Sequence, residues 1–212
     1  MNRKKFFELA YKSLQLDKDD LDQLQWAYWL AKNAHRNQER DGGERYFEHC
    51  RRVAVLFIKY LKDTENWDEL IDGRLNYREY VIVALLHDCI EDCFLPPRFI
   101  DKLYWDGIAD AVGRLSKIKR NVRNGVIKKI RISDKNYYDR ITESDFGIRI
   151  IKCLDRLDNI RDFKEWAKNR IEKYIAETKK YILPITKKTD EKLFKDLCEE
   201  IEKIKKGGEK NA

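Results

Sequence analysis

Apolar residues recur every three or four positions over most of the chain, which is the period of an amphipathic helix. One stretch, from Val81 to Leu86, is apolar all round, so we expect its helix at the centre of the fold. Nine Gly and three Pro in 212 residues leave few breaks, and no strand alternation of useful length occurs. The pattern predicts an all-α protein. The expected helices cover residues 20–39, 46–61, 77–93 and 145–168, one or two short helices within 98–117, a helix resuming near residue 137, and a last helix over 187–206.

Residues 118–136, KIKRNVRNGVIKKIRISDK, interrupt this pattern. They are strongly basic and weakly periodic, so we expect a loop. The chain as a whole carries a net charge of +7 (45 − 38), but both signs mix along almost its whole length. Such mixing is typical of a solvated surface and is compatible with a polyanionic small molecule. A nucleic-acid partner, which would show strongly salt-dependent affinity, is not expected.

The cysteines and the N-terminus indicate a cytoplasmic protein. Five cysteines without a CxxC pair are typical of reduced thiols. Cys89 and Cys93 lie one helical turn apart, but no second pair completes a four-ligand zinc site. The N-terminal segment is broken by Glu8 before an apolar core forms, so it does not read as a secretory signal. No apolar run approaches the roughly 20 residues that cross a bilayer, so no membrane partner is expected.

Candidate chemistry begins where the central apolar run ends. His87 and Asp88 follow Leu86 directly, and a buried carboxylate costs several kcal/mol unless it is paired or binds a metal. Glu91 and Asp92 lie four residues further on, so helical geometry gathers an imidazole and three carboxylates on two turns. These groups would repel one another without a cation. A helix leaving the core would explain His87-Asp88 alone, but the full HDxxED pattern favours a divalent metal site.

Further metal ligands must come from distant segments of the chain. Only three histidines are present: His49 begins an amphipathic helix and could point inward, whereas His35 could be a satisfied core histidine. Asp155 interrupts an apolar run, with Asn159 one turn further on, although a salt bridge to an arginine would also explain Asp155. Two histidines and two aspartates form a mixed nitrogen and oxygen set that suits manganese, iron or zinc, with positions left open for water.

Four ordered blocks of the sequence resemble the HD-domain hydrolase module of the RelA/SpoT alarmone enzymes, in particular its stand-alone small form. The blocks are AHRNQERDGGERYFEHCRRVA (34–54), ALLHDCIEDC (84–93), GIADAVGRLSKI (107–118) and IKCLDRLDNIRDF (151–163), in the order of the family. The resemblance implies a single helical bundle of the HD/PDEase-like type. We expect one domain over residues 1–206, with a core at about 20–168, C-terminal helices at about 169–206, and a disordered tail at 207–212.

The resemblance also implies a role for each matching residue. His49, His87, Asp88 and Asp155 correspond to the ligands of one divalent cation, usually Mn²⁺, with Fe²⁺ or Zn²⁺ as alternatives. Glu91 and Asp92 correspond to the catalytic acidic pair. Arg40 corresponds to an arginine that stacks on the nucleotide base, Asn159 to an asparagine that contacts the ribose, and Lys117 to a lysine that meets the charge of the substrate.

Three acidic residues depart from the family pattern. Asp41 replaces a basic residue, Asp158 replaces the histidine before Asn159, and Asp162 replaces a threonine. We expect these replacements to add negative charge near the nucleotide pocket and to weaken the case for guanosine.

The metal-site pattern together with the family resemblance implies a metal-dependent hydrolase of the stringent response. It would remove pyrophosphate from the 3′ position of guanosine 3′-pyrophosphate alarmones, (p)ppGpp, as a Mn-dependent guanosine-3′,5′-bis(diphosphate) 3′-pyrophosphohydrolase-like enzyme, and would carry no synthetase domain. Three alternatives remain: a related HD phosphohydrolase acting on adenosine alarmones, NADPH or nucleoside 5′-monophosphates; a non-catalytic nucleotide-binding module; and, least expected, a nucleic-acid-binding protein that uses the basic segment 118–136. Nothing in the sequence indicates the oligomeric state.

Overall fold

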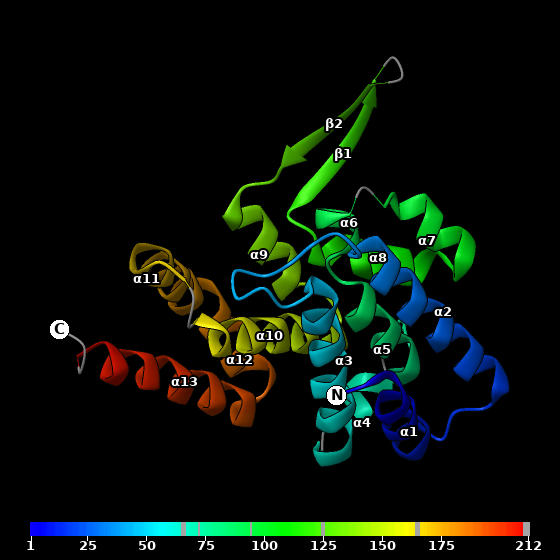
Figure 1. Ribbon diagram of the computed structural model, residues 1–212, viewed down its shortest axis with the longest axis horizontal. Helices are drawn as coiled ribbons and strands as arrows, with labels where there is room; N and C mark the ends of the chain where they lie inside the picture. The colour runs from blue at the N-terminus through cyan, green and yellow to red at the C-terminus, as the bar shows by residue number, and fades with distance from the viewer. Residues whose placement is uncertain (65–66, 72, 94, 124–125, 164–165, 210–212) are drawn as a thin grey trace.

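The computed structural model describes residues 1–64, 67–71, 73–93, 95–123, 126–163 and 166–209, and is almost entirely helical (Figure 1). The all-α prediction is therefore confirmed. The helices are α1 (Arg3–Leu14), α2 (Lys18–Ala34), α3 (Tyr46–Asp63), α4 (Trp67–Ile71), α5 (Tyr77–Leu86), α6 (Cys89–Asp92), α7 (Pro97–Leu103), α8 (Asp106–Leu115), α9 (Asp134–Thr142), α10 (Phe146–Arg161), α11 (Lys168–Glu177), the π-helical turn η2 (Thr178–Ile182), α12 (Leu183–Thr189) and α13 (Glu191–Glu209).

Helix α5 forms the centre of the bundle, as its apolar sequence predicts. Every residue from Tyr80 to Leu86 is buried, and the helix packs against α2, α3, α8 and α10. A capping box starts it, because the Asn76 side chain accepts hydrogen bonds from the first turn while Glu79 accepts from the Asn76 N–H. Because α5 is packed on all sides, the position of its C-terminal end is fixed, and the candidate site lies at that end.

The expected helix over 77–93 is two helices with a junction between them. Helix α5 ends at Leu86 and the one-turn α6 begins at Cys89. His87 and Asp88 are the capping residues at the junction. The two residues that carry the candidate chemistry therefore lie where the chain changes direction.

The prediction of a loop over 118–136 is wrong for most of that segment. Strands β1 (Ile118–Arg123) and β2 (Val126–Arg131) pair as an antiparallel hairpin, from Ile118 opposite Arg131 to Arg123 opposite Val126. The hairpin projects from the helical body (Figure 1). Two strands that stand off the body have no second core to cover, so their sequence lacks the apolar alternation by which strands are recognised.

Other boundaries differ from the prediction by a few residues or more. Helix α2 ends at Ala34 and α10 at Arg161, both earlier than expected, and α1 was not predicted. Helix α13 continues to Glu209, three residues into the expected disordered tail, and residues 210–212 lie outside the described part of the chain. Among the described residues, no helix is both long and apolar enough to cross a bilayer.

Alanine substitutions at two helical glycines should change the free energy of unfolding in opposite directions. A Cβ at Gly147 would lie 2.6 Å from ring carbons of the fully buried Tyr80, whereas a Cβ at Gly113 on α8 would meet nothing within 4 Å. We expect Gly147→Ala to lower the free energy of unfolding by about 1–3 kcal/mol through overpacking. Gly113→Ala should raise it by about 0.5–1 kcal/mol through helix propensity. Urea denaturation measures both, and equal effects would contradict this packing.

Candidate active site

The four predicted metal ligands come from separate elements and meet at one point. His49 lies on α3, His87 at the end of α5 and Asp155 on α10, and each offers a ligand atom within 4.8 Å of the others. His49 Nε2 is 3.2 Å and His87 Nε2 3.7 Å from Asp155 Oδ1. Asp88 joins them, with its Oδ2 3.0 Å from His87 Nε2 and 3.5 Å from His49 Nε2. The structure therefore brings together all four side chains.

The two imidazoles are oriented as metal ligands would be. His87 Nδ1 lies 2.8 Å from the Ala84 carbonyl oxygen and His49 Nδ1 lies 2.7 Å from Asp158 Oδ2, so the Nδ1 position of each ring is occupied. Both Nε2 atoms are buried without a hydrogen-bond partner and face the carboxylates of the cluster. Unsatisfied buried polar atoms are rare and need an explanation. A divalent cation held between these nitrogen and oxygen atoms would supply one, and the donor set suits manganese, iron or zinc.

The charges in the cluster depend strongly on one another. Burial opposes the imidazolium form of His49, but the carboxylates of Asp155, Asp158 and Asp88 outweigh it and raise the pKa of His49 to about 9. Burial likewise opposes ionisation of Asp155, but the Lys152 ammonium and the imidazoles hold its pKa well below the usual range. Without a metal, protons on the imidazoles therefore neutralise the cluster at neutral pH. A cation that binds must displace these protons, which couples metal binding to pH.

Two neighbouring side chains are less suited to hold a metal. Cys50 forms a second possible ligand group with His87 and Asp88, which sequence reasoning missed. Burial raises the pKa of the Cys50 thiol well above its usual value, so the thiol is neutral in the absence of a metal and would have to lose its proton to bind one. His35 lies outside both groups: its ring stacks on Tyr46 at 4.8 Å, and its Nδ1 lies 2.7 Å from Gln38 Oε1. His35 is thus the satisfied core histidine that the sequence left open.

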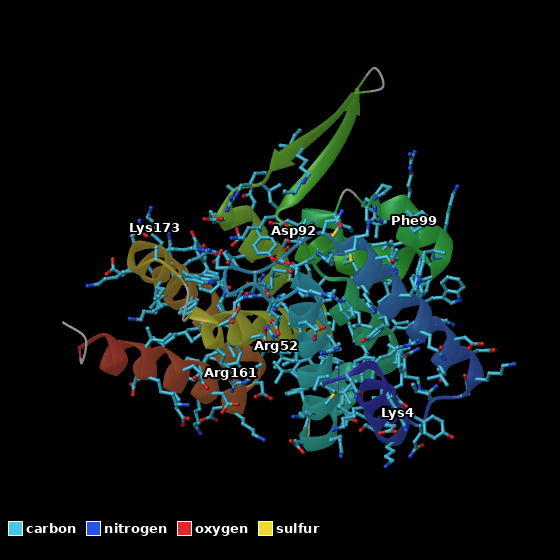
Figure 2. The ribbon with its side chains drawn as sticks, viewed as in Figure 1. Lys4, Arg52, Asp92, Phe99, Arg161 and Lys173 are labelled. Carbon is cyan, nitrogen blue, oxygen red and sulfur yellow. The ribbon has the colours of Figure 1, made fainter. Side chains whose placement is uncertain are left out.

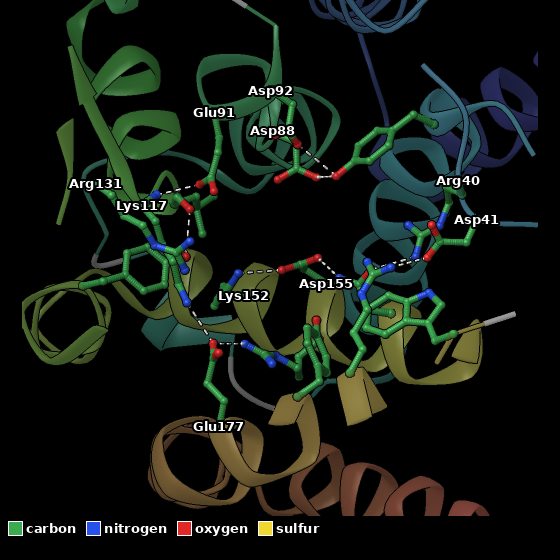
Figure 3. A pocket seen from close by; sticks show the side chains of 18 of the residues that line it. Arg40, Asp41, Asp88, Glu91, Asp92, Lys117, Arg131, Lys152, Asp155 and Glu177 are labelled. Atoms are coloured by element: carbon green, nitrogen blue, oxygen red, sulfur yellow. Dashed lines mark hydrogen bonds and ion pairs between the residues drawn. The ribbon is translucent and has the colours of Figure 1, made fainter. Parts of the chain in front are cut away.

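A cavity of about 560 Å³ opens beside the cluster (Figure 3). Asp88 and Asp155 form part of its wall, so a molecule in the cavity would reach the metal centre. The rest of the wall combines cations, aromatic rings and carboxylates. Its cationic and aromatic residues are Arg40, Tyr46, Lys117, Arg131, Tyr137, Lys152, Arg156, Trp166, Arg170 and Tyr174, and its further carboxylates are Glu39, Asp41, Glu91, Asp92 and Glu177. Such a wall suits a nucleotide, because cations bind phosphates and aromatic rings stack on a base.

The predicted acidic pair lies at the edge of the cavity, next to the cluster (Figure 3). Glu91 Oε2 accepts a hydrogen bond from the Lys117 backbone N–H at 2.6 Å. The Tyr46 hydroxyl bridges two carboxylates, 2.8 Å from Asp88 Oδ2 and 3.0 Å from Asp92 Oδ2. Burial, together with the charges of Asp88 and Glu91, raises the pKa of Asp92 to about 6. Asp92 can therefore exchange a proton near neutral pH.

The three predicted substrate-binding residues line the cavity, but each is already paired. Arg40 donates from Nε to Asp162 Oδ2 at 2.6 Å and from its terminal nitrogen to Asn159 Oδ1 at 2.8 Å. Asn159 in turn donates to Asp155 Oδ1 at 2.6 Å, which links Arg40 to the metal centre. Lys117 Nζ lies 2.8 Å from Glu177 Oε1. A substrate would have to compete with these partners.

The acidic departures from the family pattern are neutralised by arginines. Asp41 pairs with Arg170 and Asp162 with Arg40. Asp158 does not line the cavity at all, and instead lies behind His49. The expectation that it adds charge to the nucleotide pocket is wrong, because its position on α10 points it at the back of the imidazole ring.

Sequence reasoning missed several residues of the cavity wall. Lys152 donates to Asp155 Oδ2 at 2.7 Å, and the guanidinium of Arg156 lies 3.9 Å from the ring centroid of Tyr174. Both cations interrupt the apolar run of α10, so the argument that singled out Asp155 also applies to them. Trp166 and Tyr174 lie beyond the segment that carries the family resemblance and gave no such signal. Lys119 and Arg120, which follow Lys117 in the basic segment, have side chains outside the described part of the structure.

Comparison with known proteins places the chain in a family. The HD domain family matches residues 27–187, which is most of the chain. A solved structure of a SpoT ortholog from a metazoan, described as hydrolysing ppGpp, superposes with a TM-score of 0.65 at 20% identity, covering 89% of this chain and 96% of that one. The chain therefore belongs to the HD domain family and has its all-α fold.

Curated relatives of the chain are named as SpoT and RSH proteins. The bifunctional (p)ppGpp synthase/hydrolase SpoT of Escherichia coli K12 is 28% identical over 178 residues, which cover 80% of this chain and 22% of the relative. A probable chloroplastic GTP diphosphokinase, RSH2, of Oryza sativa is 26% identical over 181 residues, 82% of this chain and 23% of the relative. The resemblance read from the sequence is confirmed. The chain spans about a quarter of the length of these relatives.

Loss of a cluster side chain should abolish metal binding while the fold persists. The metal-stripped His87→Ala and Asp155→Asn proteins are titrated with Mn²⁺ by calorimetry. We expect each to bind Mn²⁺ at least about 100-fold more weakly than wild type. This loss exceeds the usual effect of removing a residue that only hydrogen-bonds to a metal ligand. Circular dichroism should show retained helicity. His35→Gln, at the histidine outside the cluster, is the matched control and should keep its affinity. Wild-type affinity in Asp155→Asn would rule out the proposed site.

Proposed function

We propose that this HD-domain protein is a metal-dependent phosphohydrolase that removes pyrophosphate from the 3′ position of guanosine 3′-pyrophosphate alarmones. One observation carries the proposal. His49, His87, Asp88 and Asp155 converge, with two unsatisfied imidazole nitrogens, beside a cavity whose wall carries both lysine and arginine side chains and the carboxylate of Glu91. The names of relatives support the choice of substrate, since one from Escherichia coli O157:H7, 28% identical, is a guanosine-3′,5′-bis(diphosphate) 3′-pyrophosphohydrolase.

The acidic pair would activate the attacking water. A divalent cation at the cluster, which we propose to be Mn²⁺, supplies Lewis acidity that makes water a nucleophile near neutral pH. Glu91 and Asp92 orient that water and accept its proton. The new bond forms between the water oxygen and the 3′-phosphorus, and the bond from that phosphorus to the 3′-oxygen breaks. Pyrophosphate leaves, and the 3′-oxygen of the nucleoside 5′-di- or triphosphate takes up a proton to become a hydroxyl group.

The cavity wall would bind the charged parts of the substrate. Lys152 and Arg156 are buried beside Asp155, where their charge is poorly screened by solvent. They can stabilise negative charge that develops on the phosphates. Arg40 and Asn159 lie on the other side of Asp155 and are proposed to contact the base and the ribose. Lys117 is proposed to meet a phosphate after leaving Glu177.

A related substrate remains the alternative. The ion pair between Asp41 and Arg170 at the cavity wall offers both a hydrogen-bond acceptor and donors to a base, so an adenine-containing alarmone would also fit this chemistry. A non-catalytic nucleotide-binding module is less well supported, because binding alone requires neither the metal cluster nor the adjacent acidic pair.

Replacing Glu91 separates catalysis from metal binding. We expect Glu91→Gln to retain its Mn²⁺ but to lose kcat by a factor of about 10² to 10⁴, the usual contribution of acid–base catalysis. Metal content and turnover are measured on the same preparation. Glu39→Gln removes an exposed carboxylate elsewhere on the cavity wall and serves as the matched control. If Glu91→Gln lost metal as well, Glu91 would be a ligand.

Product analysis tests the function directly. The metal-stripped protein, with and without Mn²⁺, is incubated with guanosine and adenosine 3′-pyrophosphates, NADPH and nucleoside 5′-monophosphates. We expect Mn²⁺-dependent release of pyrophosphate from the guanosine compound, resolved by anion-exchange chromatography. Faster release from the adenosine compound would reassign the base. Release of inorganic phosphate from NADPH or the monophosphates alone would replace the proposed reaction, and tight binding without turnover would favour the non-catalytic module.

A further inference from the structure

The two histidines of the cluster are held in different ways. His87 Nδ1 lies 2.8 Å from the carbonyl oxygen of Ala84, one turn earlier in its own chain segment. His49 Nδ1 lies 2.7 Å from Oδ2 of Asp158, a side chain on another helix. The backbone therefore orients His87, whereas the orientation of His49 depends on one carboxylate.

Helix α10 holds the His49 ring from both sides. Asp155 and Asp158 are one helical turn apart, and they approach opposite nitrogens of the ring: Asp155 Oδ1 is 3.2 Å from Nε2, and Asp158 Oδ2 is 2.7 Å from Nδ1. An ionised carboxylate only accepts hydrogen bonds. Nδ1 must therefore carry its hydrogen, which leaves Nε2 as the nitrogen available to a metal.

Arg52 fixes the carboxylate of Asp158 in turn. It lies one turn after His49 on α3, and it donates from Nε to Asp158 Oδ1 at 2.8 Å and from a terminal nitrogen to Oδ2 at 3.1 Å. Both oxygens are engaged, so the carboxylate cannot rotate away from the imidazole. The Asp158 side chain is 6% exposed and that of Arg52 35% exposed, so the pair runs from the buried cluster toward the surface. Figure 2 shows Arg52 where α3 and α10 lie against each other.

We propose that Asp158, held by Arg52, is a positioning residue that fixes the ring and tautomer of His49 and thereby sets the affinity of the site for a divalent cation. This inference rests on the metal site of the proposed function. It also explains why an aspartate stands at position 158, where the family pattern has histidine. The Asp158 carboxylate accepts a hydrogen bond from Nδ1 of the ligand His49 and does not enter the nucleotide pocket.

The first test is metal affinity. The metal-stripped full chain is titrated with Zn²⁺ by calorimetry as wild type and as Asp158→Asn, which keeps the shape of the side chain but removes its charge. We expect binding to weaken roughly 10- to 100-fold, as is usual for the partner behind a histidine ligand. Glu200→Gln is the matched control: it removes a carboxylate whose Oε1 lies 3.2 Å from Nε of Arg161, with no contact to His49, and its affinity should not change.

The second test measures the His49 ring directly. A merely structural role of Asp158 would not change the NMR signals of that ring. With three histidines in the chain, ¹⁵N-histidine labelling of the Zn²⁺-bound protein resolves each imidazole by NMR. We expect the Nδ1 resonance of His49 to shift in Asp158→Asn and those of His35 and His87 to stay in place. Unchanged Zn²⁺ affinity together with an unchanged Nδ1 resonance would overturn the inference.

Two other outcomes are also decisive. If wild type itself bound no Zn²⁺ or Mn²⁺, the metal centre of the proposed function would fail, and the role of Asp158 with it. If Asp158→Asn did not fold, the milder Arg52→Gln variant would carry the test, because Arg52 is partly exposed and leaves Asp158 in place. We expect it to bind Zn²⁺ several-fold more weakly, and wild-type affinity in a folded Arg52→Gln protein would count against the inference.

Discussion

The candidate site depends on buried charges that neutralise one another. His49, His87 and Asp155 are buried and the Asp88 side chain is 18% exposed at the cavity wall, so a charge left unpaired among the buried three would cost several kcal/mol. They are tolerable only when α3, α5 and α10 dock so that all four side chains meet. The apolar α5, buried on every side, holds that arrangement. The site therefore forms only together with the fold, since the packing that forms the core also brings the ligands together.

Much of this could be predicted from the sequence, where a rule links residue type to environment. A carboxylate inside an apolar run must have a partner, and this rule singled out Asp88 and Asp155 before any coordinates. The rule says nothing about which partner, so the sequence could not place Asp158 behind His49 rather than in the pocket. The basic hairpin was missed because strands without a core to cover carry no apolar alternation. Tyr174 lies on α11 and Trp166 just before it, so both reach the cavity only because tertiary packing places this helix beside it.

Helix α10 connects the parts of the site that carry out different tasks. One face of it directs Asp155 to the metal centre and Lys152 into the cavity, while Asn159 bridges Asp155 and Arg40. Asp158, one turn from Asp155, supports the opposite side of His49. A shift of this helix would thus move the cation, the ring that binds it and the contacts to a nucleotide together. Binding at any one of them stabilises the same position of α10.

The pairing of the cavity cations has a consequence for selectivity. Lys117 is held by Glu177, Arg170 by Asp41 and Arg40 by Asp162, so an incoming anion must trade places with carboxylates of the protein and not with water. Chloride or a single inorganic phosphate offers too few contacts to separate several such pairs at once. A ligand with phosphates at two distant points can do so, because it contacts several of these cations in a single binding event. We therefore expect the wall to disfavour small anions, chiefly at Arg40 and Lys117, whose paired side chains are little exposed.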